Sequence, residues 1–314
     1  MKCLVTGCAG FIGSTLTDRL LNDGHSVIGL DCFTDYYSPE IKRENIKGAY
    51  HHPRFTLIES DILRMSEFPE VDVVFHLAAQ AGVRASWGSD FLIYSRNNIE
   101  ATQVLLEWYR KRKLKKFVYA SSSSVYGDVP IPMREDVRIQ PVSPYGVTKL
   151  AAEHLCYLYW KNFGLPVVSL RYFSVYGPRQ RPDMAINKFV KAIFQNKPIT
   201  VFGDGSQTRD FTYVSDVVDA NIRAADSPVN GEVFNIGGGS RISVIGLIRE
   251  IEAYSGKTAQ IRFEEFQKGD VNDTLAENTK AQECLAWTPK VTISNGVKNY
   301  IEWFIKNAAV EGKT

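Results

Sequence analysis

The sequence predicts an α/β protein: a doubly wound parallel sheet with a smaller α/β part towards the C-terminus. Two observations support this fold class. Short apolar stretches rich in β-branched residues alternate with longer helical patterns over the first half of the chain, as in a parallel sheet covered by helices on both faces. A glycine-rich turn separates the first of these stretches from the first helical pattern. The 314 residues suffice for one large domain or two smaller ones.

The predicted elements follow in a regular order. Strands are expected at KCLVTG (2–7), HSVIGLD (25–31), RFTLIESD (54–61), VDVVFHLAA (71–79), KKFVYASS (115–122) and LPVVSLRYFSVYG (165–177). Helices are expected at 14–24 and 143–155, and the first of them ends at Gly24. Beyond about residue 175 the alternation loosens, with helices expected at 185–196, 214–226, 244–256 and 295–308 and a strand-and-turn region at 199–216. The strand expected at EVFNIGG (232–238) can return to the first sheet.

Composition and charge exclude several classes of partner. The formal net charge is +2, which favours no nucleic-acid partner; the cationic run RKRKLKK (110–116) is interpreted as a solvated helix end. No stretch approaches 18 apolar residues, so no membrane span is expected. Five scattered cysteines without a CxxC pair indicate reduced thiols and no metal site. A strand begins almost at the first residue and leaves no room for a signal peptide, so a cytoplasmic location is expected.

The turn TGCAGFIG places Gly7, Gly10 and Gly13 between the first strand and the first helix. Glycines at this spacing allow a tight turn, the approach of backbone to a pyrophosphate and close packing of helix on strand, in a Rossmann-type arrangement. Asp31 ends the second strand. A carboxylate there accepts hydrogen bonds from a ribose diol and repels a 2′-phosphate, which favours NAD over NADP. The alternative is a helix-packing turn with a solvated aspartate.

Small or acidic residues end the next two strands. Asp61 follows the third strand and is placed to meet an adenine amino group, and Ala78 and Ala79 follow the fourth, where their size lets a nucleotide lie against the sheet. Ligands of open parallel sheets bind at these carboxyl ends.

Four serines, 121 to 124, end the fifth strand, and Tyr145 and Lys149 share one face of the following helix. Tyrosine has a reference pKa of about 10 and is a poor base at neutral pH. An ammonium one turn away, together with a nicotinamide cation, lowers that pKa. Tyr145 is then able to take a proton from a substrate hydroxyl as hydride leaves the same carbon, with Ser122 or Ser123 holding the hydroxyl and relaying the proton.

These segments resemble the extended short-chain dehydrogenases/reductases, in particular the nucleotide-sugar epimerase and dehydratase group. The resemblance rests on TGCAGFIG, Asp31, LAAQAGV, SSSSVYG, YGVTK and RYFSVYGPRQRPDM and covers essentially the whole chain. It implies a tightly held NAD and a UDP-sugar substrate. The implied cofactor-binding residues are Gly7, Gly10, Phe11, Ile12, Gly13, Asp31, Asp61, Ile62, Leu77, Ala78, Ala79, Gln80, Asn98, Tyr145, Lys149 and Tyr172.

Ser124 distinguishes among members of the group. Dehydratases of the family carry acidic residues in this segment, and its UDP-glucuronate decarboxylases carry a glutamate immediately before VYG, where this chain has Ser124. A site that lacks the extra acid suits oxidation and re-reduction at C4 of the sugar. The segment YFSVYGPRQRPDM (172–184) resembles that of UDP-glucuronate 4-epimerases, and Arg181 within it is the expected partner of a uronate carboxylate. A solvated loop with surface arginines is the alternative.

The implied reaction is NAD-dependent epimerisation of UDP-glucuronate to UDP-galacturonate at C4 through a transient 4-keto sugar. A UDP-glucose/galactose 4-epimerase, a UDP-glucuronate decarboxylase and a non-catalytic NAD-binding sensor are the alternatives. The implied substrate-binding residues are Arg84, Ser122, Ser124, Ser174, Arg181, Lys188, Phe202, Gln207, Arg209 and Asp270. Gln267 departs from the arginine that many relatives carry there, which leaves one phosphate contact in doubt.

The expected organisation is an NAD-binding domain at 1–174, joined by part of 210–237, and a mainly UDP-sugar-binding domain at 175–314. By analogy with relatives that pair through helices flanking the tyrosine, the apolar stretch AAEHLCYLYW (151–160) suggests a homodimer.

Overall fold

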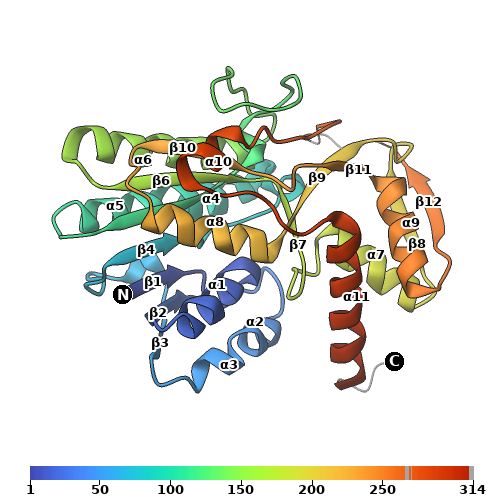
Figure 1. The fold of residues 1–314 in the computed structure, drawn as a ribbon, viewed down its shortest axis with the longest axis horizontal. Coiled ribbons are helices and arrows are strands. Elements are labelled where there is room, and N and C mark those ends of the chain that lie inside the picture. The colour runs from blue at the N-terminus through green and yellow to red at the C-terminus, as the bar shows by residue number, and fades with distance from the viewer. Residues whose placement is uncertain (266–268, 270, 311–314) are drawn as a thin grey trace.

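A seven-stranded sheet, in the order β10-β6-β5-β4-β1-β2-β3, forms the centre of the protein (Figure 1). The computed structural model describes residues 1–265, 269 and 271–310. The strands are β1 (Lys2–Thr6), β2 (Ser26–Asp31), β3 (Phe55–Glu59), β4 (Val73–His76), β5 (Lys116–Ser122), β6 (Val167–Tyr172) and β10 (Glu232–Ile236). Every neighbouring pair is parallel. The predicted doubly wound parallel sheet is confirmed, and its order reverses beside β1, where such sheets bind ligands.

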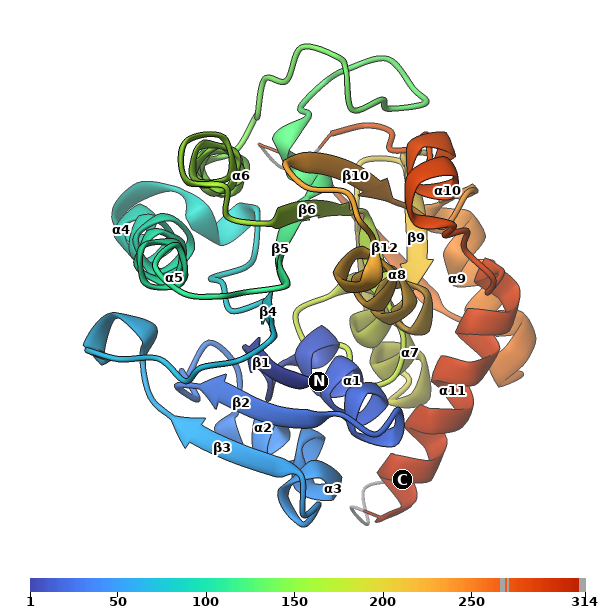
Figure 2. The same cartoon turned by 60° about the vertical axis from the view of Figure 1, so that its left-hand side comes forward.

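Helices cover both faces of this sheet (Figure 2). One face carries α4 (Phe91–Tyr94), α5 (Ala101–Tyr109) and α6 (Pro144–Phe163), and the other carries α1 (Phe11–Asn22) and α8 (Val214–Asp226). Two further helices, α2 (Pro39–Asn45) and α3 (Lys47–Tyr50), lie between β2 and β3 in the chain. Along β1, Cys3 and Val5 belong to one hydrophobic cluster and Leu4 to the other. Side chains of a strand alternate between faces, so β1 buries both of its faces.

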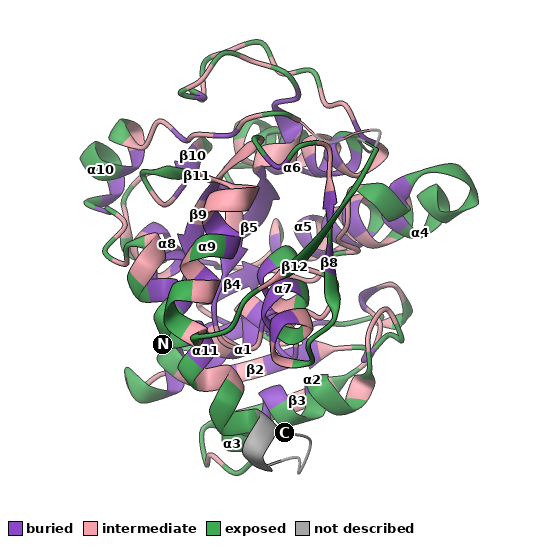
Figure 3. Cartoon of the chain, turned by 90° about the vertical axis from the view of Figure 1, so that its right-hand side faces the viewer, coloured by how far each residue is buried: buried purple, intermediate pink, exposed green. Residues whose placement is uncertain are grey.

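Among the described residues, the remaining strands form two small sheets, accompanied by four further helices. One sheet has the order β11-β9-β7 and the other pairs β12 with β8. Their strands are β7 (Ser174–Tyr176), β8 (Pro198–Phe202), β9 (Thr208–Tyr213), β11 (Arg241–Ser243) and β12 (Gln260–Glu264). The helices are α7 (Ala185–Phe194), α9 (Val244–Ser255), α10 (Thr279–Leu285) and α11 (Ile293–Val310). Figure 3 shows that β12 is exposed along its length, whereas interior strands of the central sheet such as β4 and β5 are buried.

The chain leaves the central sheet after β6, returns to it at β10 and leaves it again for β11. The single strand predicted over 165–177 is wrong: β6 and β7 belong to different sheets, with Phe173 between them. The Phe173 amide still donates to the Ile236 carbonyl of β10 (3.1 Å), and the next residue, Ser174, begins β7 of the other sheet. In the other direction, β10 pairs with β6 and brings residues 232–236 back to the central sheet.

Residues at both ends of the cationic run 110–116 form hydrogen bonds or ion pairs with other residues. Lys116 is buried, and its ammonium donates to the Ser227 and Val229 carbonyls and to the Asn230 side chain. Arg110 pairs with Glu107. Among the described helices, none is long and apolar enough to cross a membrane.

Candidate active site

The glycine-rich turn brings α1 against the carboxyl end of β1. A Cβ atom on Gly13 would lie 2.1 Å from the Gly7 carbonyl oxygen, so only glycine permits this approach. The Asp31 carboxylate accepts hydrogen bonds from the Ala9 amide (3.1 Å) and the Phe33 amide (2.9 Å) and thereby fixes the turn to the end of β2. No side chain caps the N-terminus of α1. Its first amides are therefore available to an anion, which fits the pyrophosphate of a dinucleotide.

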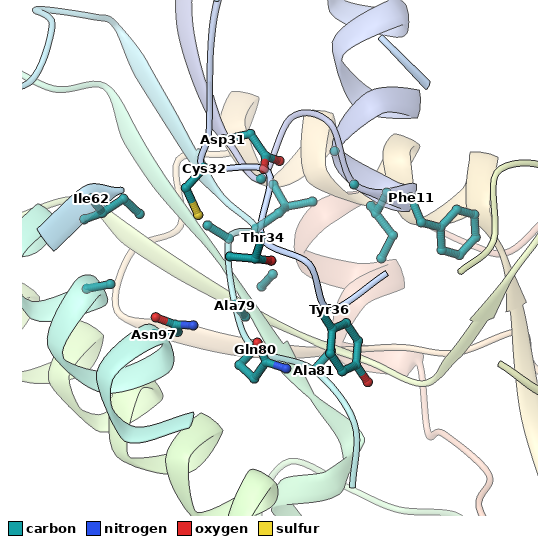
Figure 4. Close-up of a pocket in the computed structure, with 18 of the residues that line it drawn as sticks. Phe11, Asp31, Cys32, Thr34, Tyr36, Ile62, Ala79, Gln80, Ala81 and Asn97 are labelled. Atoms are coloured by element: carbon teal, nitrogen blue, oxygen red, sulfur yellow. The ribbon is translucent and has the colours of Figure 1, made fainter. Parts of the chain in front are cut away.

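A cavity lies over this turn (Figure 4). Fifteen of the sixteen residues expected to bind the cofactor line it: Gly7, Gly10, Phe11, Ile12, Gly13, Asp31, Asp61, Ile62, Leu77, Ala78, Ala79, Gln80, Tyr145, Lys149 and Tyr172. Asn98 is the exception. It lies buried behind the cavity, where its side chain accepts from the Gln80 amide (2.7 Å) and donates to the Gln80 carbonyl (3.0 Å) and to Thr148 (2.9 Å). Asn98 therefore holds the cavity wall in place, and Asn97 lines the cavity instead.

Sequence reasoning missed a group of cavity residues that follows Asp31 directly. The segment contributes Cys32, Thr34, Tyr36, Tyr37 and Lys42 to the lining (Figure 4). The Lys42 ammonium donates to the Thr34 carbonyl (2.8 Å) and lies 5.0 Å from the centre of the Tyr37 ring. The available signal was position: the segment leaves the sheet at the carboxyl end of β2, where ligands bind.

Asp61 has structural partners of its own. One carboxylate oxygen accepts from the Leu63 amide (2.9 Å) and caps the short 3₁₀ helix Ile62–Arg64. The other accepts from the Arg96 guanidinium (3.1 Å).

The N-terminus of α6 presents Tyr145 to the cavity. Ser143 caps the helix by accepting from the Gly146 amide (3.1 Å), and Pro144 occupies the first turn. The Tyr145 amide donates to the Ser86 hydroxyl (3.1 Å). A Cβ atom on Gly146 would lie 2.3 Å from the Ser124 carbonyl oxygen, so glycine allows the helix to approach the serine segment closely.

The surroundings of Tyr145 and Lys149 shift the pKa values of both side chains. Burial raises the pKa of the Tyr145 phenol, while a hydrogen bond with Ser122 and the charge of Arg181 act in the opposite direction. Burial lowers the pKa of the Lys149 ammonium to about 7. This ammonium lies 4.5 Å from the centre of the Tyr119 ring. Burial therefore favours the neutral phenol in the chain alone, and a bound nicotinamide cation would act in the opposite direction by favouring the phenolate.

The four serines at the end of β5 have different partners. Ser121 lines the cavity and donates to the buried Glu153 carboxylate (2.7 Å). Ser122 hydrogen-bonds Tyr145, and its hydroxyl also accepts from the Ser124 amide (3.1 Å). Ser123 and Ser124 open a short 3₁₀ helix and are half-buried.

Arg181 lies beside Tyr145 in the cavity wall but already has a partner. Its guanidinium makes two hydrogen bonds to Asp183, of 2.9 and 3.0 Å. Tyr36 also donates to Asp183 (3.2 Å). A substrate carboxylate at this position would share Arg181 with Asp183.

Of the expected substrate residues outside the cavity, Arg84, Phe202 and Gln207 lie together. The Arg84 guanidinium stacks 4.3 Å from the centre of the Phe202 ring, and the Gln207 side chain donates to the Phe202 carbonyl (2.6 Å). Arg209 donates to the Thr208 and Asn272 carbonyls. Ser174 is half-buried on β7 and Lys188 is exposed on α7. Asp270, Gln267 and Lys268 lie outside the described residues.

Comparison with known proteins identifies the relatives of this chain. The model of the NAD dependent epimerase/dehydratase family matches residues 3–237. A UDP-glucuronate 4-epimerase of Thermodesulfobacterium geofontis is 40% identical over 97% of this chain and 96% of its own. An uncharacterized UDP-glucose epimerase of Bacillus subtilis is 46% identical, over 96% and 98%. The crystal structure of UDP-glucuronic acid 4-epimerase from Bacillus cereus with UDP-glucuronic acid and NAD matches with a TM-score of 0.94 and 45% identity, over 98% of this chain and all of that one.

The matched segment contains the glycine turn, the serine segment and the Tyr145–Lys149 pair. The chain therefore belongs to the NAD dependent epimerase/dehydratase family.

Proposed function

We propose that the protein is an NAD-dependent UDP-glucuronate 4-epimerase that interconverts UDP-glucuronate and UDP-galacturonate. One observation carries the proposal: Tyr145, Lys149 and Arg181 meet in the wall of a cavity whose remaining lining suits a dinucleotide. No carboxylate interrupts serines 121 to 124. Relatives and a solved structure named as UDP-glucuronate 4-epimerases support the same reaction.

In the proposed reaction a bound NAD, held by the cavity lining, would supply the hydride acceptor and donor for C4 of the sugar. Tyr145 takes the proton of the C4 hydroxyl as the C–H bond breaks, which leaves a 4-keto sugar, and it gives the proton back in the reverse step. The Lys149 ammonium stabilises the phenolate, and Ser122 or Ser123 holds the hydroxyl and relays its proton. The glycine turn binds the pyrophosphate, and Asp31 accepts hydrogen bonds from the ribose diol.

The sugar nucleotide is proposed to bind beyond Tyr145. Arg181 pairs with the uronate carboxylate, and the group formed by Arg84, Phe202 and Gln207 accommodates the uridine. Ser124, Ser174, Lys188, Arg209 and Asp270 complete the proposed substrate-binding residues.

A UDP-glucose/galactose 4-epimerase is the second candidate, and one observation favours it. Arg181 is already neutralised by Asp183, so a sugar without a carboxylate leaves this ion pair intact. The relative named as an uncharacterized UDP-glucose epimerase points the same way.

The decisive experiment incubates the purified protein with UDP-glucuronate, and separately with UDP-glucose, and resolves the sugar nucleotides formed. UDP-galacturonate should appear. Tyr145→Phe should lower the rate by at least about 100-fold, because the base is lost. Arg181→Met should raise KM for UDP-glucuronate and leave that for UDP-glucose nearly unchanged. Turnover of UDP-glucose alone would favour the second candidate.

We also propose that residues 1–174, with part of 210–237, form the NAD-binding domain and that 175–314 mainly bind the UDP-sugar. A homodimer is proposed through α4 and α6. These helices contact one another and expose large apolar side chains: Phe91, Leu92, Ile93, Val147, Tyr157 and Leu158. Apolar patches of this kind mark protein interfaces.

A further inference from the structure

Glu153 is a buried carboxylate that the proposed reaction does not use. It lies on α6 one helical turn after Lys149 and two turns after Tyr145, so the three residues share a face. Its side chain is 4% exposed. Charged side chains are this deeply buried only when they are paired.

The partners of Glu153 connect three elements of the active site. The Arg171 guanidinium on β6 donates to both carboxylate oxygens, at 3.0 and 2.6 Å, and is itself 3% exposed. The Ser121 hydroxyl on β5 donates to the same carboxylate (2.7 Å). Arg171 and Ser121 are also partners in the register of β5 and β6. Glu153 therefore fixes α6 to the end of β5, next to Ser122.

The charge of the Glu153 carboxylate also acts on the Lys149 ammonium and favours its protonated form. The groups that interact with the ammonium are Cys156 and Glu153 on α6, Tyr119 on β5 and His76 on β4, and Tyr145 lies one turn before Lys149 on the same helix. Burial raises the pKa of the Cys156 thiol and lowers that of His76 to about 3, so both are neutral near pH 7. Of these neighbours, the Glu153 carboxylate is the one that carries a negative charge to offset the cost of burying the ammonium.

We infer that Glu153 is a positioning residue for the Tyr145–Lys149 pair: it anchors the serine segment to α6 and keeps the proton of the pair at neutral pH. The inference rests on the proposed function for the identity of the base, but not on the identity of the sugar. Removal of a negative neighbour disfavours the protonated form of Lys149, whose pKa should therefore fall. Tyr145 lies one turn away on the same helix face, so we expect its pKa to follow as the two groups titrate together.

The test compares Glu153→Gln with the parent in two measurements. The first is the pH profile of kcat, in which both limbs should move to lower pH by about one unit. The second needs no sugar: the tyrosinate absorbance of the NAD-loaded protein is titrated, and the signal of a matching Tyr145→Phe protein is subtracted. Its midpoint should fall by a similar amount. Glu153→Asp, which keeps the charge, should leave both in place even if the rate falls.

Two further variants separate this role from a structural one. Glu107→Gln removes another arginine-paired carboxylate, one that also contacts α6 through Tyr159, and should shift neither measurement. Glu153→Gln leaves Arg171 buried without its carboxylate; if that protein fails to fold, Glu153→Gln with Arg171→Gln removes both charges. A smaller downward shift is expected there, because Glu153 lies closer to Lys149 along α6.

The inference would be overturned if both limbs of the pH profile of kcat and the midpoint of the tyrosinate titration stayed unchanged in Glu153→Gln or in the double variant. This holds even if the rate fell at every pH. A shifted tyrosinate midpoint in a protein that does not epimerise UDP-glucuronate would retain the inference and reject the proposed substrate. The two failures are therefore distinguishable.

Discussion

At the scale of single residues, neighbouring serines act through different partners. Ser121 is tied to Glu153 and Ser122 to Tyr145, whereas Ser124 stands where decarboxylases of the family carry an acid. The consequence concerns the 4-keto intermediate proposed for a uronate, which is a β-keto acid. Such acids lose CO2 when the breaking bond aligns with the carbonyl π system, so the site must withhold acid assistance.

Ser124→Glu should therefore divert the reaction. We expect release of CO2 and formation of a UDP-pentose to increase by about 10-fold or more, because a general acid is placed beside the intermediate. The assay measures CO2 and resolves the sugar nucleotides. Ser124→Gln supplies the same bulk without the acid and serves as the control. No rise in decarboxylation above this control would contradict the prediction.

A second prediction concerns the pH dependence of the free energy of unfolding, and it follows from the burial of Lys149. Its pKa of about 7 in the folded chain lies below its reference value of about 10.4. Between these values the unfolded chain binds more protons, so the contribution of Lys149 to the free energy of unfolding rises with pH.

Compared with Lys149→Met, the parent should gain about 1 kcal/mol of unfolding free energy per pH unit between pH 7 and 9. Urea unfolding of both proteins without cofactor, at several pH values, measures the difference. Groups that titrate alike in both proteins cancel in this comparison. A difference independent of pH would show that the folded Lys149 keeps its proton throughout.

Much of the cavity lining was predictable from the sequence, and the reason is local. Glycine spacing and strand ends specify which backbone and side-chain groups face a dinucleotide, and Gly7, Asp31 and Ala78 line the cavity as expected. The pairing of Arg181 with Asp183 was not predictable, because both side chains come from an irregular loop whose path depends on tertiary contacts. The burial of Glu153 was also not predictable, because a carboxylate on a helix is expected to face solvent unless a buried partner such as Arg171 is known.

At the scale of elements, α6 organises the site. Its N-terminus contacts the serine segment at Gly146, and its next two turns carry Lys149 and Glu153 towards β5 and β6. Cap and first turn were readable from the sequence as Ser143 and Pro144. The division of 165–177 into β6 and β7 was not readable, because a continuous apolar run contains no signal for a change of sheet.

Gly146→Ala should separate α6 from the serine segment. The new methyl group would meet the Ser124 carbonyl, so either the helix or the segment must move. We expect a loss of about 1–3 kcal/mol of unfolding free energy, typical of overpacking, and a lower kcat. Chemical unfolding and kinetics measure both.

Gly48→Ala is the matched control, because a Cβ atom there meets nothing within 4 Å. That variant should be neutral or slightly stabilised, since alanine favours the helix. Equal behaviour of the two variants would rule out close contact at Gly146.

At the scale of the whole molecule, the apolar surfaces of α4 and α6 support the proposed homodimer. Leu92 is 74% exposed and Leu158 is 49% exposed. Complete burial of a fully exposed leucine is favourable by about 1.5–3 kcal/mol, and each of these side chains would gain the fraction that corresponds to its exposed part. A second copy of the same surface would provide that burial by a two-fold axis.

Leu158→Asp should convert the proposed dimer to a monomer, because a charge would be buried in the interface. Sedimentation equilibrium measures the mass. Ile305→Asp places the same charge on α11, where the apolar side chain is 46% exposed, and should leave the dimer intact. A parent protein that sediments as a monomer would refute the proposal directly.

The return of β10 to the central sheet bears on how the protein is made. During synthesis, β6 emerges from the ribosome well before β10, the strand at 232–236. Until β10 is made, the backbone groups on that edge of β6 have no strand to pair with. An unpaired edge of this kind is a template for other nascent chains. A gene fragment that stops after β6 would leave it permanently open, so the half of the protein that carries the glycine turn should be recovered mainly in inclusion bodies when expressed alone.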